Sequence, residues 1–405
     1  MPQYRAEWLL PISQPPIRDA WLRTERGRVV AFGHSRPGDL TASDEFDLGN
    51  VAVLPALVNA HTHLELSWMR GRVPATDDFP TWLRTVLELR RSGPENTGEI
   101  EAAIAGAIQE ARAFGTGLVG DISNTLATSI ALAMHEMPAM VFLELIGFQS
   151  SEAANIVDAG LKALREIPVA DDVRHSLAPR APYSVSPALF AHIRAVLNQD
   201  PFARTTVHLG ESRAEVEFLL EGKGPCKVLL EDLGKWDPEW AAPECSPVEY
   251  AERLGFLDDR VVVGHGVQFG PTELKRIAAK GATLVTCPRG NIRTGAGEPP
   301  VADFFESGIR VALGTDSLAS VPDLSLFAEL EEMRRLAPHL PARVLLEAAT
   351  INGAYALGFE PDFGTIDSGK RDSLVAVQLD GRPGSIEEYL LSGIEAEQIH
   401  WVSRL

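Results

Sequence analysis

Short apolar runs alternate with helix-like stretches through most of the chain. Eight runs have the length and apolar character of buried strands, and they lie at residues 51–60, 115–123, 139–148, 173–182, 204–211, 260–267, 281–288 and 308–317. Between two of these runs, Ile100, Ile104 and Ile108 fall on one face, which predicts an amphipathic helix. Repeated strand–helix units with apolar strands indicate a parallel sheet buried on both faces. Eight such units predict an α/β fold, a (β/α)8 TIM barrel, over residues 55–359.

The two ends of the chain have a different pattern. Residues 1–54 contain short β-prone runs separated by Pro, Gly and Asp, and SLVAVQL at residues 373–379 has the same character. We therefore predict a small β-sandwich built from both ends, residues 1–54 and 360–405. The barrel would then be an insertion between its two halves.

Composition and charge narrow the class of protein. The chain has 405 residues, and its net charge of −19 would repel nucleic acid. No run approaches the ~20 apolar residues of a membrane span, and the N-terminus lacks a signal-peptide pattern. Three cysteines match no zinc-finger or CxxC spacing. We expect a cytoplasmic protein with a small-molecule substrate and neither a nucleic-acid nor a membrane partner; a homo-oligomer stays open.

Five polar residues stand where four of the apolar runs end. His61 and His63 follow the first run, and His208, His265 and Asp316 end three later ones. Functional residues of TIM barrels lie at the carboxyl ends of the strands, so we expect these five side chains to meet. A second group of histidines lies in loops or helical stretches, where we expect structural roles: His34, His135, His192, His339 and His400.

The spacing of His61 and His63 suits a metal ion. Residues i and i+2 of an extended backbone point to the same side, so both rings can reach one ion at ~2.0–2.1 Å. His208 and Asp316 would complete a set that leaves room for water, which is typical of a catalytic metal. Imidazole and carboxylate ligands suit zinc and iron. We expect one divalent ion, with zinc favoured and iron as the alternative.

Glu211 follows His208 by three residues and can face the same cavity. A carboxyl group there can carry protons between water and a substrate nitrogen. The alternative is an acidic residue that the helix dipole favours at a helix N-terminus. His265 would orient the attacking water or stabilise charge on the attacked carbon, or serve as a further ligand.

The segments PALVNAHTHLELS, HLGES, VVGHG and LGTDSLAS resemble the amidohydrolase superfamily, and more narrowly its cytosine-deaminase/chlorohydrolase-like branch. The resemblance covers nearly the whole chain, including GTIDSGKRDSLV near the end. It implies His61, His63, His208 and Asp316 as metal ligands, with Glu211 as the proton shuttle and His265 beside the metal. Binuclear members need a carboxylated lysine, and HSLAPRAPYSVS contains none, so the resemblance implies one metal.

Within that branch, HTHLELS, TWLRTVLELRR, LVGDISN, APYSVSP and CPRGN are similar to the deaminases of aminodeoxyfutalosine, an adenine nucleoside derivative in a route to menaquinone. The resemblance implies attack by metal-activated hydroxide on an aminopurine nucleoside, and Trp82 as an aromatic that lines the purine pocket. Arg180 stands where related enzymes usually have His. It would bind an anionic part of the substrate, or form a structural salt bridge.

Two alternatives and one segment stay open at this stage. A related hydrolase acting on guanine, a triazine, S-adenosylhomocysteine or methylthioadenosine would share all the metal ligands. A non-catalytic metal-binding scaffold would lack a ligand or the Glu, and neither is missing. Residues 222–247 contain Trp236 and Trp240 and form a predicted loop at the barrel mouth. That loop is either a lid over the substrate or an excursion that the two tryptophans anchor.

Overall fold

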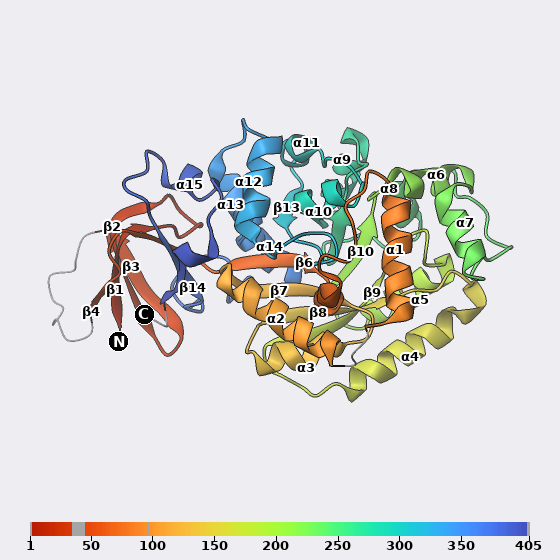
Figure 1. Ribbon diagram of the computed structural model, residues 1–405, viewed down its shortest axis with the longest axis horizontal. Helices are drawn as coiled ribbons and strands as arrows, with labels where there is room; N and C mark the ends of the chain where they lie inside the picture. Colours follow the sequence, from red (N-terminus) through yellow and green to blue (C-terminus); the bar gives the residue numbers. More distant parts are fainter. Residues whose placement is uncertain (1, 35–44, 95–97, 403–405) are drawn as a thin grey trace.

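The computed structural model describes residues 2–34, 45–94 and 98–402. Two parts follow one another along its longest axis (Figure 1): a barrel of parallel strands ringed by helices, and a β-sheet that holds both chain ends. Among the described residues, no helix combines the length and the apolar character that crossing a bilayer requires. The cysteines Cys226, Cys245 and Cys287 are buried and unpaired.

Eight parallel strands form the barrel in two hydrogen-bonded groups of four. They are β6 Leu57–Thr62, β7 Thr116–Ser123, β8 Ala139–Leu145, β9 Val173–Pro179, β10 Thr205–Leu209, β11 Val261–His265, β12 Thr283–Thr286 and β13 Arg310–Leu313. Backbone hydrogen bonds join the two groups at both remaining edges: His208 N–H donates to Arg180 O (2.8 Å), and Asp316 N–H to His61 O (3.0 Å). The predicted α/β barrel fold is confirmed.

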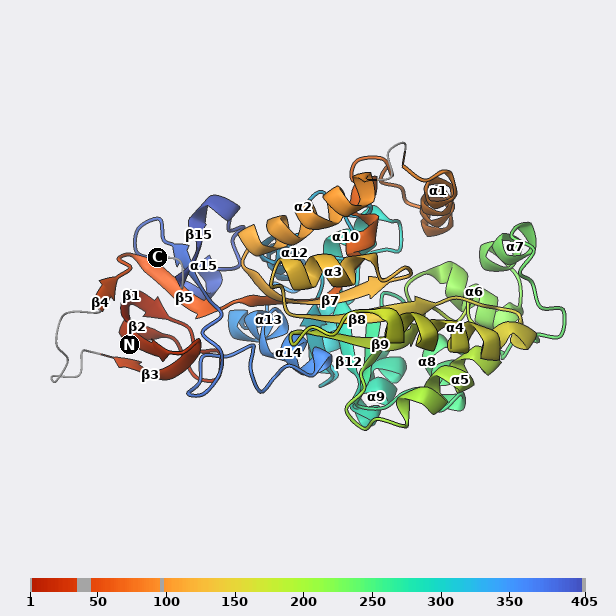
Figure 2. The ribbon, with the colours of Figure 1, turned by 90° about the horizontal axis from the view of Figure 1, so that it is seen from below.

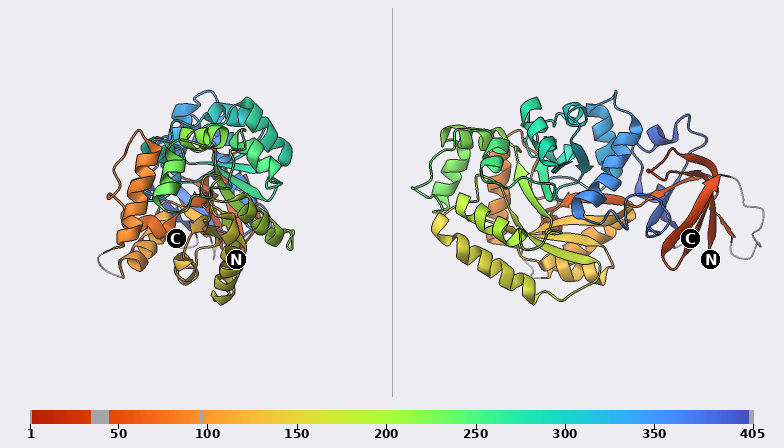
Figure 3. Two further views of the ribbon diagram at one scale, coloured as in Figure 1. Left: turned by 90° about the vertical axis from the view of Figure 1, so that its right-hand side faces the viewer. Right: turned by 180° about the vertical axis from the view of Figure 1, so that it is seen from behind.

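Helices surround the barrel on its outer face, as the end-on view in Figure 3 shows. Those between β6 and β10 are η2 Leu64–Met69, α1 Phe79–Ser92, α2 Glu99–Ala113, α3 Ala127–Met134, η3 Ser150–Glu152, α4 Ala153–Glu166 and α5 Pro187–Leu197. Those that follow β10 are α6 Arg213–Glu221, α7 Pro225–Asp232, α8 Pro247–Arg253, α9 Pro271–Lys280, α10 Pro288–Arg293, α11 Val301–Glu306, α12 Leu326–Leu336, α13 Ala342–Ala348 and α14 Ile351–Leu357.

The apolar periodicity after residue 99 corresponds to the buried face of α2. Ile104 and Ile108 of α2 are each 1% exposed, and Ile100 packs against the same core. Inside the barrel, Ala356 of α14 packs with the strand residues Ala60 and Val262. The barrel is therefore filled by side chains at this level, which leaves the other end of the strands for a site.

Strands from both chain ends pair in one seven-stranded sheet beside the barrel (Figure 2). Its members are β1 Gln3–Leu9, β2 Ile17–Glu25, β3 Arg28–His34, β4 Glu45–Asp47, β5 Val51–Pro55, β14 Leu374–Gln378 and β15 Ile399–Trp401. The C-terminal stretch also contains α15 Ile386–Tyr389 and η4 Ala396–Gln398. Antiparallel pairing of β14 with β5 ties the two ends together. The domain bounds at 54/55 and 359/360 stay a prediction, and residues 35–44 and 403–405 lie outside the described residues.

The apolar run at 51–60 contains two strands where the sequence indicates one. Its first half, β5, belongs to the terminal sheet, and its second half, β6, is the first barrel strand. Pro55 ends β5, and proline cannot donate to a strand ladder. The chain therefore changes sheets at Ala56, inside a stretch in which only Asn59 is polar.

Candidate active site

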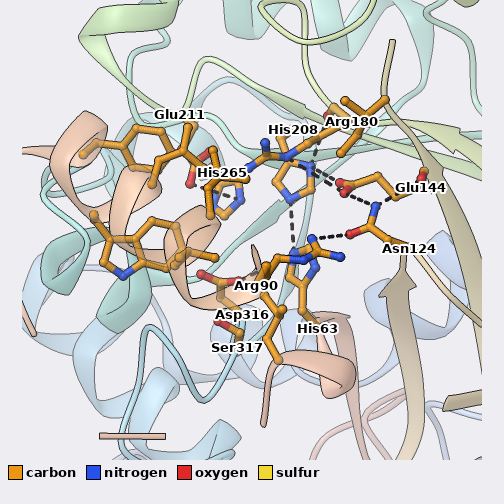
Figure 4. Close-up of a pocket in the computed structure, with 17 residues that line it drawn as sticks. His63, Arg90, Asn124, Glu144, Arg180, His208, Glu211, His265, Asp316 and Ser317 are labelled. Atoms are coloured by element: carbon orange, nitrogen blue, oxygen red, sulfur yellow. Dashed lines mark hydrogen bonds and ion pairs between the residues drawn. The ribbon is translucent and has the colours of Figure 1, made fainter. Parts of the chain in front are cut away.

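A cavity opens at the carboxyl ends of the barrel strands (Figure 4), with an empty volume of about 560 Å³. Seven of the eight predicted site residues line it: His63, Trp82, Arg180, His208, Glu211, His265 and Asp316. The eighth, His61, is fully buried and within 4.8 Å of the ligand atoms of its neighbours. The structure therefore brings together all the residues that the strand-end pattern singles out.

His61 is the last residue but one of β6, and it packs against two glycines, Gly314 just after β13 and Gly264 in β11. A Cβ on Gly314 would lie 2.7 Å from the His61 Cβ, and a Cβ on Gly264 would lie 3.1 Å from its ring. The imidazole fits only because both positions lack a side chain. Neither ring nitrogen of His61 has a hydrogen-bond partner among the described residues. A buried imidazole with two unsatisfied nitrogens is costly unless another group binds it.

His63 and His208 approach each other from opposite sides of the barrel. Their Nε2 atoms lie 3.2 Å apart, close to the ~3.3 Å that separates two nitrogen ligands of a tetrahedral ion. The Nδ1–H of His208 donates to the Arg180 carbonyl (3.1 Å), so its Nε2 keeps a free lone pair. A hydrogen bond of this kind fixes the tautomer in which the other nitrogen can bind a metal.

Asp316 and His265 hold unusual backbone conformations at their strand ends. Their φ values are +61° and +72°, in the left-handed region that residues with a Cβ rarely adopt. The chain turns sharply there, and Asp316 Oδ1 lies 3.7 Å from His63 Nε2. Backbone strain of this kind persists where the surrounding structure enforces it, and it gathers at functional sites.

His265 is held from one side and faces Glu211 from the other. Its Nδ1 donates to Asn291 Oδ1 (2.8 Å), and its Nε2 lies 3.6 Å from Glu211 Oε1. Glu215 in turn accepts hydrogen bonds from the backbone N–H groups of Gly210 and Glu211 (3.0 and 3.1 Å). The Glu211 backbone is therefore fixed beside His265 at the start of α6.

Burial sets the protonation of the site. It lowers the pKa of His61, His63 and His208 well below 6.5, so these imidazoles are neutral, which is the form that binds metals. Burial also raises the pKa of Asp316 to about 6 and that of Glu211 to about 8. A protonated Glu211 can donate to a basic nitrogen in the cavity.

The donor set fits a divalent metal ion. His61, His208 and His265 form one group of atoms within 4.8 Å of one another, and His61, His63 and Asp316 form a second. Neutral imidazole nitrogens and one carboxylate are the ligands that zinc and iron accept. A metal ion bound by one ring nitrogen of His61 would also give that nitrogen the partner that it lacks among the described residues.

Arg180 lies beside a carboxylate and also reaches the cavity. Its Nε lies 3.9 Å from Glu144 Oε2, and its side chain still lines the cavity at 19% exposure. Glu144 also lies 3.5 Å from His208 Nδ1 and accepts from the Asn124 amide (2.9 Å). Arg90 completes this wall by donating to Asn124 Oδ1 (2.6 Å).

Sequence reasoning missed these neighbours of Arg180. Glu144, Asn124 and Arg90 all line the cavity, but none was singled out. The available signal is a carboxylate in an otherwise apolar strand, since Glu144 stands in AMVFLEL and Asp121 in TGLVGDIS. Asp121 accepts from the backbone N–H of Leu64 (2.8 Å), directly after His63.

The histidines outside the site follow the expectation in part, because His34 and His400 lie in strands β3 and β15 and not in loops or helical stretches. His175, which the strand-end pattern did not sort, lies within β9 and contacts Ser129 Oγ of α3 (3.0 Å) outside the cavity. His34, His135, His192, His339 and His400 do not line it either.

Trp82 lies in α1 and lines the cavity beside Phe79, with the two ring centroids 5.8 Å apart. The segment 222–247 contains the helix α7 as well as a loop. Trp236 and Trp240 of that loop stack on Phe148 and Phe218, at centroid distances of 5.7 and 4.5 Å. The packing agrees with a loop that the two tryptophans anchor, because both side chains pack against the main hydrophobic core.

Comparisons with known proteins agree with this geometry. Residues 52–397 match the amidohydrolase family. The chain is 27% identical over 384 residues to the 5-methylthioadenosine/S-adenosylhomocysteine deaminase of Moorella thermoacetica, covering 92% of this chain and 84% of that protein.

Two solved structures are also similar at 25% identity. Helicobacter pylori aminofutalosine deaminase in complex with methylthio-coformycin superposes with a TM-score of 0.84, covering 96% of this chain and 95% of the other. A zinc-bound adenosine deaminase from Xanthomonas campestris superposes with a TM-score of 0.79, covering 98% and 90%.

Fold and site together define a hydrolase of the deaminase type, which acts on carbon–nitrogen bonds other than peptide bonds. The chain belongs to the amidohydrolase family. Its His/Asp cluster fits the divalent metal of that family, and its relatives act on small nucleosides of the purine class.

Proposed function

We propose that this protein deaminates an adenosine with a modified 5′ position, and that aminodeoxyfutalosine, on a route to menaquinone, is its substrate. The observation that carries the proposal is the placement of Glu211, with its raised pKa, beside His265 in the cavity that holds the His/Asp cluster. The similarity to the aminofutalosine deaminase of Helicobacter pylori supports this choice of substrate. The second candidate is deamination of 5-methylthioadenosine or S-adenosylhomocysteine, which the similarity to the Moorella protein favours.

We assign His61, His63, His208 and Asp316 as ligands of one metal ion, with zinc favoured over iron. Such an ion would lower the pKa of bound water from 15.7 to about 7. Asp316, with His265, accepts a proton from the attacking water and directs its oxygen to the carbon that carries the amino group. Glu211 donates its proton to the ring nitrogen next to that carbon, which makes the carbon electrophilic. Ammonia then leaves with a proton supplied within the site.

Shape and charge of the cavity support a purine nucleoside. Trp82 and Phe79 offer an aromatic wall on which a purine ring can pack. Arg180 and Arg90 supply positive charge on the opposite wall, toward Glu144 and Asn124. We place the protein in the cytoplasm, and its three unpaired cysteines agree with a reducing compartment.

The substrate is tested by measuring kcat/KM for ammonia release from a panel of nucleosides. The panel contains adenosine, 5-methylthioadenosine, S-adenosylhomocysteine and aminodeoxyfutalosine, with guanine and a triazine as compounds outside the class. We expect aminodeoxyfutalosine to have the highest kcat/KM. A higher value for 5-methylthioadenosine or S-adenosylhomocysteine would select the second candidate, and release only from guanine or the triazine would contradict both.

Arg180 is expected to select substrates whose 5′ substituent ends in a carboxylate. We predict that Arg180→His lowers kcat/KM for S-adenosylhomocysteine about tenfold relative to that for 5-methylthioadenosine, which has no carboxylate, because the ion pair with the guanidinium is lost. Arg180→Lys retains the charge without the planar fork and should lie between the two. An unchanged ratio in Arg180→His would leave Arg180 as a structural partner of Glu144 alone.

A further inference from the structure

The segment CPRGN, residues 287–291, contacts the candidate active site and has no part in the roles proposed above. Most of it forms the start of α10, which follows β12 directly. A Cβ on Gly290 would lie 3.2 Å from the Cβ of Asp316 and 3.4 Å from its Oδ2, so α10 packs closely against this carboxylate. The next residue, Asn291, is hydrogen-bonded to His265. The short helix therefore touches both residues that we expect to act on the attacking water.

A buried ion pair holds α10 in this place. The Nε–H of Arg289 donates to Glu329 Oε1 of α12 (2.8 Å), and the backbone N–H of Arg289 donates to Glu329 Oε2 (3.0 Å). The same guanidinium donates to Asp323 Oδ1 (2.9 Å). Glu329 is 0% exposed. Hydrogen bonds between charged groups are stronger than neutral ones, so the first turn of α10 is fixed against α12.

The hydrogen bond between Asn291 and His265 decides which ring nitrogen of the histidine carries the proton. A neutral imidazole has one N–H group, on Nδ1 or on Nε2. His265 Nδ1 lies 2.8 Å from Asn291 Oδ1, which can only accept, so the N–H group is the one on Nδ1. Both side chains are 1% exposed, so bulk water does not compete for this bond.

The other ring nitrogen of His265 points to the reaction centre. Its Nε2 has no hydrogen-bond partner among the described residues and lies 3.6 Å from Glu211 Oε1. With the proton held on Nδ1, Nε2 keeps a free lone pair and can accept a proton. In the other tautomer Nε2 would itself carry a hydrogen and could not accept one.

From this geometry we infer that Asn291 is a positioning residue for the reaction: its amide oxygen holds His265 in the tautomer whose Nε2 can accept a proton from the attacking water. The inference rests on the proposed function, in which His265 and Asp316 act on that water. Asn291 acts through His265 and is not among the residues that line the cavity. Its loss should therefore lower kcat and leave KM nearly unchanged.

Two variants of Asn291 separate its acceptor oxygen from its shape. Asn291→Leu has a similar size and no acceptor, and we expect kcat for ammonia release from aminodeoxyfutalosine to fall about 10- to 100-fold, the usual cost of losing the partner of a functional imidazole. Asn291→Asp keeps an oxygen for the Nδ1–H group, and its kcat should exceed that of Asn291→Leu at least about threefold. Equal kcat values in the two variants would overturn the inference.

Asn352→Leu is the matched control for the loss of a buried amide. Asn352 lies in α14 and donates to the Val311 carbonyl of β13 (2.8 Å), so the variant removes one hydrogen bond from the same barrel. Its kcat should equal that of the wild type. A loss of kcat in Asn352→Leu as large as that in Asn291→Leu would assign Asn291 to stability alone and overturn the inference.

Nuclear magnetic resonance of zinc-loaded protein with ¹⁵N-labelled histidine measures the tautomer itself. The signals of His265 are those that disappear in His265→Gln. We expect a protonated Nδ1 and a bare Nε2 in the wild type and in Asn291→Asp, and a proton on Nε2 in Asn291→Leu. A proton on Nε2 in the wild type, or one tautomer in all three proteins, would overturn the inference.

The tautomer is measured without turnover, which separates this inference from the proposed function. The expected tautomers in a protein that releases no ammonia from any adenosine derivative would overturn the deaminase proposal and retain Asn291 as the residue that sets the tautomer of His265. Ammonia release at equal kcat by the wild type and Asn291→Leu would overturn the role of Asn291 and retain the deaminase.

Discussion

Glu211→Gln is expected to lower kcat for deamination by about 100- to 10,000-fold, with metal content unchanged. The carboxyl group is placed to donate a proton to the ring nitrogen, and proton transfer by a positioned side chain contributes rate factors of this size. Gln has nearly the same shape but no acidic proton. Because Glu211 is not among the proposed metal ligands, the variant should bind metal and substrate as the wild type does, so KM should change little.

A control at the far end of α6, the helix that follows Glu211, isolates the effect of Glu211. Glu221→Gln removes an exposed carboxylate at the end of α6, where it pairs with Lys223. Its kcat should equal that of the wild type. Steady-state ammonia release and metal analysis on one batch of each variant make the comparison. Turnover near the wild-type level in Glu211→Gln would remove Glu211 from the mechanism.

His61→Ala is expected to remove the metal and nearly all activity together. Partners that only orient a ligand are worth 10–100-fold in metal affinity, so loss of a direct ligand should cost more than about 100-fold. His61 is central to the proposed set because it is buried and because its two nitrogens have no hydrogen-bond partner in the part of the chain that the structure describes. Metal analysis after dialysis should find the wild type loaded and the variant empty.

Thermal unfolding gives a second readout for this variant. A ligand that binds only the folded state at 1,000 times its Kd stabilises it by about 4 kcal/mol, so a chelator should lower the Tm of the wild type. The same chelator should leave the Tm of His61→Ala unchanged, while the control His192→Ala, on the surface of α5, should behave as the wild type. Wild-type metal content in His61→Ala would show that His61 is not a ligand.

The barrel and the centre of the site could be predicted from the sequence because both follow from position along the strands. An apolar run that ends in a polar residue places that residue at the carboxyl end of a parallel strand, and the barrel brings all such ends together. His61, His208, His265 and Asp316 were found in this way. The break at Pro55 could not be predicted in this way, since the residues on both sides of it, 51–58, are apolar and buried in both sheets.

The walls of the site depend on loops, which the strand pattern does not describe. Arg90 comes from α1, and Asn124 comes from the loop after β7. Arg90 donates to Asn124, and Glu65 accepts hydrogen bonds from Arg90 and from the backbone N–H of Asn124. Long-range contacts of this kind leave no periodicity in the sequence, so the substrate was harder to predict than the metal.

The most direct test of the account is the time course of ammonia release from aminodeoxyfutalosine, with the metal content of the same purified sample measured beside it. The account predicts catalytic release by a protein that holds one divalent metal ion per chain, and loss of that release when a chelator removes the ion. A fully metal-loaded sample that releases no ammonia from aminodeoxyfutalosine or any other adenosine derivative would contradict it.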